Sequence, residues 1–326
     1  MTDSNGDALI LAVPSKGRLK EQADAWLADC GFALQAVGGA RGYRAAIDKL
    51  PQVQIQLLSP SDIAAAVDAG EVHLGVTGED LLRERGEGID ARVMLLRALG
   101  FGRADVVVAA PKSWIDVDSM ADVEEVAAAY LARTGRRLRV ATKYLVQTRG
   151  FFARHGVADY RIVESGGATE GAPAAGAAEL IVDITTTGAT LAANNLKIIA
   201  DGVILKSEAQ LAASLKASWS VQQLSVVRFF LRTVEARGRA KGLAAVQWPA
   251  EQDAAAQGPL GPFLDKGASR RAQGMLSPMK DLFAAANALA DAGIGPAAAS
   301  RPDYVFEPEC VAVDTLAARL GLELAK

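Results

Sequence analysis

The stretch that most constrains this chain is residues 179–195, where a short apolar run leads into a hydroxyl-rich turn and then into small helix-forming residues. Residues 180–184 are rich in β-branched side chains and predict a buried strand, interrupted only by Asp183. The unpaired N–H groups and the dipole of the following helix attract anions, and Gly188 allows a phosphate to approach the backbone closely. The stretch therefore predicts a phosphate cradle beside a carboxylate suited to sugar hydroxyls or Mg²⁺.

This turn lacks the Gly-Lys-Ser/Thr of a Walker loop and the Gly-x-Gly-x-x-Gly of a dinucleotide loop. It resembles the loop with which type I phosphoribosyltransferases hold phosphoribosyl pyrophosphate, except that Ile184 stands where those enzymes have a second acid. An ordinary helix start after a strand of an α/β sheet is the alternative, since such turns are common.

Composition limits the function classes. The chain has 326 residues, of which 50% are hydrophobic and 22% charged, and this length suits two domains or two domains and a tail. The net charge of −3 does not indicate a basic surface for general binding of nucleic acids or membranes. The first seven residues are polar and unlike a signal peptide, and Cys30 and Cys310 are far apart, so we expect a cytoplasmic protein without a disulfide framework. His73 and His155, the only histidines, lie in no metal-binding pattern.

Four further predicted strands also end in polar turns, which places those turns where open α/β sheets bind ligands. For Lys16 and Arg18, solvated surface charge is the equally open alternative. The turns follow strands 8–13, 72–76, 138–141 and 160–163, and they carry Lys16 and Arg18, then Thr77 and Gly78, then Tyr144, then Glu170.

Alternating strands and helices predict parallel sheets covered on both faces. We expect two α/β lobes with a cleft between them: residues 1–102 with 183–225, and the inserted residues 103–182. The remaining residues 226–326 predict a mainly helical C-terminal extension of uncertain fold, because long helical patterns over 208–238, 281–292 and 311–320 flank a Pro/Gly-rich stretch.

Six segments, in order between residue 8 and about residue 205, together resemble ATP phosphoribosyltransferase, the enzyme that opens histidine biosynthesis. They are residues 12–19, 74–82, 99–103, 139–144, 165–170 and 183–191. The resemblance implies a two-lobed fold like that of type II periplasmic binding proteins and a homo-oligomer. It also implies transfer of phosphoribosyl from phosphoribosyl pyrophosphate to N1 of ATP, with Mg²⁺ as cofactor and pyrophosphate as product.

The same resemblance implies roles for individual residues. The catalytic set is Lys16, Arg18, Asp183 and Glu170, with Glu170 as the hypothetical proton acceptor. The residues that bind phosphoribosyl pyrophosphate are Asp183, Thr185, Thr186, Thr187, Gly188, Ala189 and Thr190. Those on the ATP side are Arg18, Thr77, Gly78, Arg103, Tyr144, Arg149 and Glu170. Mg²⁺ would arrive on the substrate, because no cluster of protein ligands is evident and only Asp183 is a candidate ligand.

The chain departs from the family at two places. Ser59 precedes Pro60 where many relatives have an arginine, so one phosphate contact is expected to come from elsewhere. Long-form relatives end in a ferredoxin-like domain that binds histidine, whereas short-form relatives stop near residue 230 and depend on a subunit like histidyl-tRNA synthetase. Without an evident strand pattern after residue 240, the chain is closer to the short form with an atypical extension, and a regulatory partner is left open.

Two other classes remain as alternatives. One is a two-lobed protein that binds or senses a small molecule without catalysis. The other is a structural subunit with a decayed site, against which Lys16, Arg18 and Asp183 argue. Incubation with ATP and phosphoribosyl pyrophosphate distinguishes all three.

Overall fold

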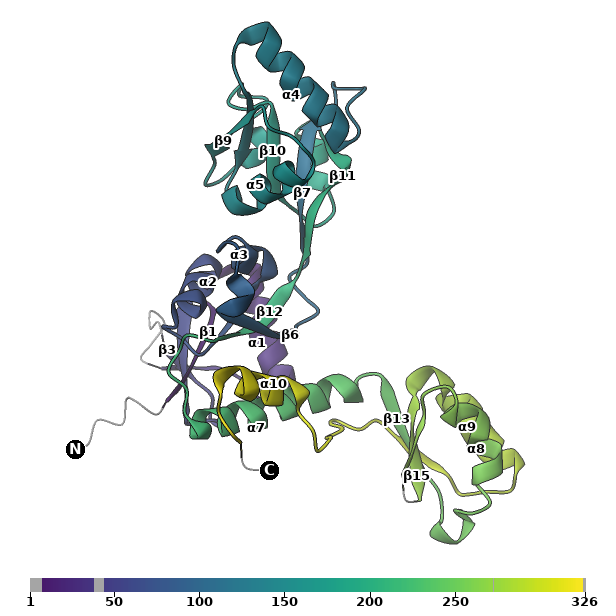
Figure 1. Ribbon diagram of the computed structural model, residues 1–326. Helices are drawn as coiled ribbons and strands as arrows, with labels where there is room; N and C mark the ends of the chain where they lie inside the picture. Colours follow the sequence, from purple (N-terminus) through teal and green to yellow (C-terminus); the bar gives the residue numbers. More distant parts are fainter. Residues whose placement is uncertain (1–7, 38–43, 272, 325–326) are drawn as a thin grey trace, which may run out of the picture. The chain divides into compact units, whose positions relative to one another are not determined.

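A computed structural model of the chain describes residues 8–37, 44–271 and 273–324, which form two compact units (Figure 1). Within these ranges, the first unit holds residues 8–28, 32–223 and 316–323, and the second holds residues 29–31, 224–315 and 324. The polar residues 1–7 lie outside the described part. Both predicted α/β lobes belong to the first unit.

The first lobe is built on a seven-stranded sheet. Its β1 pairs in parallel with β4 and β5, while β12 is antiparallel to β5 and β6. Along the sheet, the strands are β2 (Gln35–Val37), β3 (Arg44–Ala46), β4 (Val53–Leu58), β1 (Leu9–Pro14), β5 (Leu74–Gly78), β12 (Ala209–Ser214) and β6 (Val93–Ala98). The helices of this lobe are α1 (Gly17–Asp29), α2 (Pro60–Ala69), α3 (Glu79–Arg83) and the 3₁₀ turn η1 (Ile89–Ala91).

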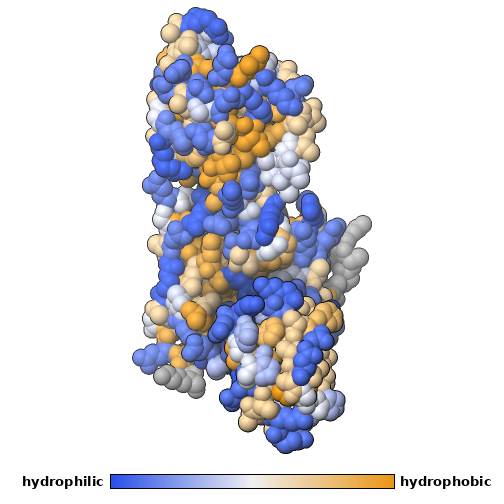
Figure 2. Space-filling model, turned by 90° about the vertical axis from the view of Figure 1, so that its right-hand side faces the viewer, coloured by the Kyte–Doolittle hydropathy of each residue, from blue (hydrophilic) through white to orange (hydrophobic). Residues whose placement is uncertain are grey.

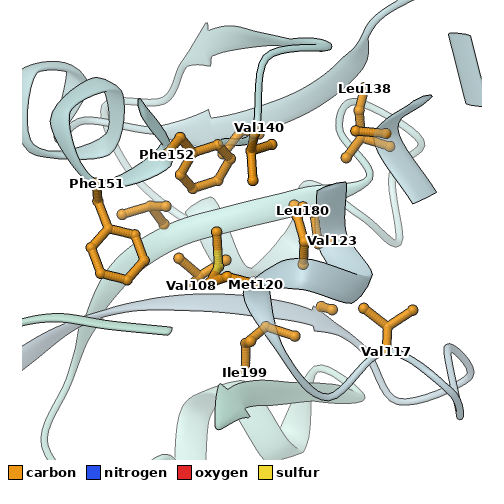
Figure 3. Packing of buried hydrophobic residues seen from close by; sticks show 14 of the residues in the cluster. Val108, Val117, Met120, Val123, Leu138, Val140, Phe151, Phe152, Leu180 and Ile199 are labelled. Carbon is orange, nitrogen blue, oxygen red and sulfur yellow. The ribbon is translucent and has the colours of Figure 1, made fainter. Parts of the chain in front are cut away.

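The second lobe has a five-stranded sheet whose apolar core is shown in Figure 3. There Phe152 of α5, Val140 of β8 and Val108 of β7 point toward one another and are fully buried. Along the sheet, the strands are β11 (Leu196–Ser207), β7 (Ala104–Pro111), β10 (Leu180–Thr185), β8 (Leu138–Thr142) and β9 (Tyr160–Glu164). The helices are α4 (Met120–Thr134), α5 (Leu145–Arg154), α6 (Ala189–Ala193) and the 3₁₀ turn η2 (Thr169–Gly171).

Both lobes share one strand order, although no internal repeat is visible in the sequence. The order β4-β1-β5-β12-β6 in the first lobe corresponds to β9-β8-β10-β7-β11 in the second. In each lobe the antiparallel strand, β12 or β7, is the one that arrives from the other lobe. The chain therefore crosses between the lobes twice, as the sequence predicted.

The second crossing lies later in the chain than the predicted lobe border. Strand β10 continues through Asp183 to Thr185 in register with β7, and β11 returns beside β7 as far as Ser207. Residues 183–207 thus belong to the second lobe and not to the first.

The structure also corrects the prediction for residues 209–214. The sequence pattern predicts a long helix there, but these residues form the buried strand β12. An Ala-rich central strand has no alternating apolar pattern, so the sequence does not distinguish it from a helix.

The second unit contains helices, as expected, but also a sheet that the sequence did not predict. Its order β14-β15-β13-β16, with antiparallel neighbours throughout, and its chain order βαββαβ define a ferredoxin-like fold. The elements are β13 (Leu243–Gln247), η3 (Ala250–Gln252), α8 (Gln257–Leu264), β14 (Ser269–Arg271), β15 (Gly274–Pro278), η4 (Met279–Asp281), α9 (Leu282–Asp291) and β16 (Ala298–Ser300). This unit is the architecture associated above with the long form, so the expected likeness to the short form is corrected.

Long helices flank this sheet in the sequence. Helix α7 (Val221–Ala240) precedes it, and α10 (Val311–Leu320) follows it. Leu260 of α8 and Leu289 of α9 pack with Val246 and Met275 of the sheet in a core of their own. The second unit thus has its own sheet and its own buried apolar cluster, as a separately folded body requires.

No helix in the described ranges is long and apolar enough to cross a membrane. The face shown in Figure 2 carries hydrophilic side chains interspersed with smaller hydrophobic areas.

Candidate active site

A cavity of about 700 Å³ lies in the first unit and is lined by turns from both lobes. Each turn follows the carboxyl end of a strand, except for the crossing segment 100–104, which also lines the cavity. The first lobe contributes Arg18, Leu19 and Gln22 after β1, Pro60 and Ser61 after β4, and Gly78, Asp80 and Leu81 after β5. The second lobe contributes Lys143 and Tyr144 after β8, and Ile184 and Thr186 at the end of β10. The cavity occupies the position at which open α/β sheets bind ligands.

The charges along this cavity favour an anion. Arg18, Arg103 and Lys143 line it, and none of them forms an ion pair with another described residue. The one lining carboxylate, Asp80, is buried and accepts hydrogen bonds on both oxygens. Three cations with free donors can therefore meet the oxygens of a phosphate ligand.

Asp80 ties the two lobes together. Its Oδ2 accepts a hydrogen bond of 2.7 Å from the Tyr144 hydroxyl, and its Oδ1 accepts one of 2.9 Å from the Ser207 hydroxyl. Burial, followed by the Asp80 charge, raises the pKa of Tyr144, so the phenol stays protonated. The predicted contact of Tyr144 with ATP is thereby limited to its ring, because its hydroxyl is already bound to Asp80.

Three other residues predicted on the ATP side do not line the cavity: Thr77, Arg149 and Glu170. Asp183 does not line it either, although its neighbour Ile184 does. Thr77 is fully buried and donates its hydroxyl to the carbonyl oxygen of Pro60 at 2.7 Å, so it positions the turn instead of a ligand. Arg149 is exposed on α5, where its charge opposes the burial that raises the pKa of Tyr160. Gly78 does line the cavity, and a Cβ at this position would lie 2.2 Å from Asp80 Oδ1, so only glycine fits there.

The predicted phosphate turn lies at the surface and not inside the core. Thr185 Oγ1 accepts the Gly188 N–H at 2.8 Å, and the Thr186 hydroxyl donates to the carbonyl oxygen of Arg103 at 3.2 Å. Gly188 has φ of +73°, a value that favours glycine, and α6 starts at Ala189. Thr187, Ala189 and Thr190 are exposed and are not among the residues that line the cavity, whereas Thr186 is.

Asp183 stands between charges of opposite sign. Burial raises the pKa of its carboxyl, the Ile184 N–H and the Lys143 ammonium lower it, and the Glu170 carboxylate raises it. Asp183 and Glu170 are both half-buried, so these charges act on each other with limited screening. The described residues contain no group of three or more His, Cys, Asp or Glu side chains placed to hold a metal ion.

Of the two cations predicted after β1, only Arg18 lines the cavity, although both Lys16 and Arg18 are exposed. Lys143 and Phe101 were not predicted as site residues. The signal for Lys143 was present in the sequence, because it follows a predicted strand in the same way as Lys16 and Arg18. Phe101 lies in the crossing segment, where only Arg103 is predicted to contact a ligand.

Fold and site together define a class: a two-lobed α/β protein with a cationic cavity for a phosphate-bearing ligand between its lobes. Residues 59–233 match the family model described as HisG: ATP phosphoribosyltransferase. The ATP phosphoribosyltransferase of Caulobacter vibrioides is 68% identical over 96% of this chain and 98% of that protein. That of a Bradyrhizobium species is 58% identical over 71% of each. This chain belongs to the ATP phosphoribosyltransferase family.

A solved structure is also similar to this chain. It is the ATP phosphoribosyl transferase (HisG:HisZ) complex from Thermotoga maritima, with a TM-score of 0.53, 25% identity, and coverage of 70% of this chain and 96% of that chain. With the strand order of the two lobes, this match confirms the expected two-lobed α/β fold of the type II periplasmic-binding-protein kind.

Proposed function

We propose that this chain transfers the phosphoribosyl group of phosphoribosyl pyrophosphate to N1 of the adenine of ATP and releases pyrophosphate, as the first step of histidine biosynthesis. The observation that carries the proposal is the convergence of three cations, Arg18, Arg103 and Lys143, on one cavity whose wall includes Thr186 of the turn after Asp183. Both substrates are polyphosphates, so such a cavity suits the two of them.

The chemistry explains why a cationic site without a nucleophile is sufficient. Adenine N1 already carries a lone pair, so attack needs no base to begin it. The barrier lies in breaking the bond between ribose C1 and pyrophosphate, which places negative charge on the leaving group. Fixed cations and oriented N–H groups stabilise that charge, and positioning of the two substrates supplies the rest.

In the proposed arrangement, the turn from Thr185 to Thr190 holds the 5-phosphate and Asp183 binds the ribose hydroxyls. Four cations neutralise phosphate oxygens: Lys16, Arg18, Arg103 and Lys143. Many relatives have an arginine where this chain has Ser59, and these cations supply the phosphate contact that the arginine would make. Glu170 accepts the proton that leaves the adenine.

Mg²⁺ belongs to the proposal as the cofactor carried by pyrophosphate, where it would neutralise the leaving charge. Asp183 is the residue that would contact it, and its half-buried carboxylate beside Glu170 fits a hard cation with oxygen ligands. The protein part of this arrangement is the Asp183 carboxylate, which Lys143 helps to keep ionised.

The test is a transferase assay with ATP and phosphoribosyl pyrophosphate, followed by the ultraviolet absorbance of the N1-alkylated adenine. We expect an absorbance rise that needs both substrates and that Asp183→Asn reduces by about 10²-fold or more. Asp118→Asn, an exposed change in the same lobe, serves as the control. If both substrates bind without turnover, even with a regulatory subunit added, the chain is a binding or sensing protein.

The protein environment is the final part of the proposal. The Thermotoga maritima relative is named as a complex of HisG with HisZ. We place a homo-oligomer of this chain in the cytoplasm. Its ferredoxin-like unit is the long-form architecture, so a requirement for a HisZ-like regulatory subunit is an open question that the next experiment answers. The same transferase assay with and without such a subunit measures whether turnover requires it. Light scattering of both samples measures the oligomeric state.

A further inference from the structure

A second cavity, of about 540 Å³, lies wholly within the second lobe and is lined by one tyrosine and four arginines. These are Tyr130 of α4, Arg136 and Arg137 of the following turn, Arg139 of β8 and Arg161 of β9. Arg139 and Arg161 are the second residues of their strands, so the cluster lies at the amino ends of β8 and β9. Lys143 and the rest of the candidate active site follow the opposite, carboxyl ends of this sheet.

The backbone fixes the arginines as neighbours. Arg139 and Arg161 are directly paired in the parallel ladder of β8 and β9, so their side chains leave the same face of the sheet. Helix α4 ends at Gly135, whose φ of +67° reverses the chain. The Arg136 N–H donates to the Thr134 hydroxyl at 3.2 Å, which holds Arg136 and Arg137 in the turn that reaches the cavity.

Most of the positive charge here has no counter-charge. Glu179 neutralises Arg139, with Nη2 to Oε1 at 2.6 Å, and the same carboxylate accepts the Arg139 backbone N–H and the Tyr130 hydroxyl. Arg136, Arg137 and Arg161 are exposed and form no ion pair with another described residue. Glu179 is already bound by three donor groups, so three further guanidinium groups surround a concave site without an anion.

We propose that this cavity is a second binding site, which takes a small anion carrying two or more linked phosphates. Each guanidinium presents a planar fork that matches two phosphate oxygens, so three uncommitted forks suit a chain of phosphates better than a single carboxylate. The volume is within the range of small-ligand pockets. A nucleic acid would need a basic track that continues across the surface, whereas the overall charge of this chain is −3.

Two sources share this chemistry: an inorganic polyphosphate, such as pyrophosphate or its longer homologues, and the phosphate chain of a nucleotide. Tyr130 lines the cavity by its ring, since its hydroxyl is bound to Glu179. A base could therefore contribute a contact that an inorganic chain lacks.

The experiment is isothermal titration of the full-length protein with inorganic tripolyphosphate at low ionic strength. The wild type is compared with Arg137→Ala/Arg161→Ala and with the control Arg154→Ala, which removes an exposed arginine of α5 that lies outside this cavity. We expect the double variant to bind one equivalent fewer than the wild type, or to bind that equivalent at least 10-fold more weakly. Its transferase turnover and circular dichroism should match those of the wild type, and Arg154→Ala should keep every equivalent.

A second pair of titrations uses Arg161→Lys, which keeps the charge but not the fork, and GTP as the nucleotide probe. Intermediate affinity in Arg161→Lys supports bidentate binding. Equal affinity for GTP and tripolyphosphate assigns the site to the phosphate chain alone, and tighter GTP binding assigns it to a nucleotide. Unchanged stoichiometry and affinity in the double variant, for both probes, would overturn the proposal.

Discussion

At the scale of single residues, the decisive group is the carboxyl of Asp183, because its neighbours act on it in opposite directions. Burial and the Glu170 charge raise its pKa, while the Ile184 N–H and the Lys143 charge lower it. The balance leaves the pKa above its usual value, so the protonated form gains population at a higher pH than for a solvated aspartate. If ionised Asp183 binds the ribose, activity must fall as the pH falls through this raised pKa.

This balance predicts opposite shifts of the acidic limb of the pH–rate profile. Glu170→Gln removes a negative neighbour, lowers the pKa of Asp183 and moves the limb to lower pH, with kcat/KM also reduced by about 10²-fold because the proposed proton acceptor is lost. Lys143→Met removes a positive neighbour, raises that pKa and moves the limb to higher pH, with kcat/KM also reduced by about 10- to 100-fold. The measurement is kcat/KM against pH for the wild type and both variants. Shifts of both variants in one direction would contradict the assigned role of Asp183.

The reach of sequence reasoning differs among these residues. Arg18, Gly78 and Thr186 could be placed at the cavity because each lies after a predicted strand. Arg103 was predicted there only from the family resemblance. The internal partners of Thr77 and Tyr144 could not be predicted, because Pro60 and Asp80 accept their hydroxyl groups across long sequence separations. Whether a polar side chain faces a ligand or a buried acceptor depends on this tertiary pairing.

At the scale of elements, α5 of the second lobe begins against an acid of the first lobe. It has no hydrogen-bonding side-chain cap of its own, and Glu84 accepts the N–H groups of Val146 at 2.8 Å and Gln147 at 3.2 Å. An anion at a helix start satisfies unpaired N–H groups and complements the helix dipole.

We expect Glu84→Ala to lower the free energy of unfolding by about 1 kcal/mol, the usual value for loss of a helix cap. For a protein of this size, this corresponds to a fall in Tm of about 2–4 °C. Thermal unfolding followed by circular dichroism measures the change, with the exposed neighbour Glu87→Ala as the matched control. Equal Tm values for the two variants would show that the cap contributes nothing.

A second contact between elements predicts acid sensitivity. Asp68, at the end of α2, binds Arg92 at 2.5 Å and Arg85 at 3.1 Å through its two oxygens. Burial raises the pKa of Asp68, but the hydrogen bonds from the two arginines outweigh this effect, and the pKa lies below the usual aspartate value of 3.8. Because the folded-state pKa is depressed, the stabilisation is present above pH 3.8 and is lost as the pH falls toward the lower folded value.

Asp68→Asn should therefore cost about 2 kcal/mol at neutral pH, the usual value for hydrogen bonds to a charged group. The difference in unfolding free energy from the wild type should shrink as the pH falls below the usual pKa of an aspartate. Urea unfolding across this pH range measures it, and Asp116→Asn, an exposed change, is the control. A difference that does not depend on pH would rule out the ionic contribution.

Elements with a strong pattern could be predicted from the sequence, and short elements could not. The strands before the ligand turns are short apolar runs in which single polar residues such as Arg139 and Asp183 stand, and the structure has them as β1, β5, β8, β9 and β10. Strands β14 and β16 have three residues each, and β13 and β12 are rich in alanine, which has no strand preference. Their hydrogen-bonded partners determine their conformation, and a local pattern does not report those partners.

At the scale of the whole molecule, the same limit concealed three features. The two lobes share one strand order, but their sequences show no repeat. A common topology requires apolar residues at similar positions in the strands, and it does not require the same residues. From the sequence, the second crossing between the lobes is predicted at Asp183, whereas the structure has it after Ser207. A ligand-binding turn and a lobe border have the same polar composition, so the sequence does not distinguish them. The ferredoxin-like sheet was missed with its strands. Helices α7, α9 and α10 were predicted, but α8 lies in the Pro/Gly-rich stretch and was not.

The separate core of the second unit leads to a prediction about the whole chain. Val246 is fully buried among Trp248, Leu260 and Leu289, so Val246→Asp places an unpaired charge in that core at a cost of several kcal/mol, about the stability of a small domain. We expect the second unit to unfold while the first unit, whose cores contain none of these residues, keeps its fold and its transferase turnover. Calorimetry should show one transition lost and one retained, and trypsin should cut within residues 243–300, which hold the sheet of the second unit. Phe283→Asp, which changes a side chain 78% exposed in the same unit, should leave both transitions in place. Loss of turnover in Val246→Asp alone would show that the catalytic unit depends on a folded C-terminal unit.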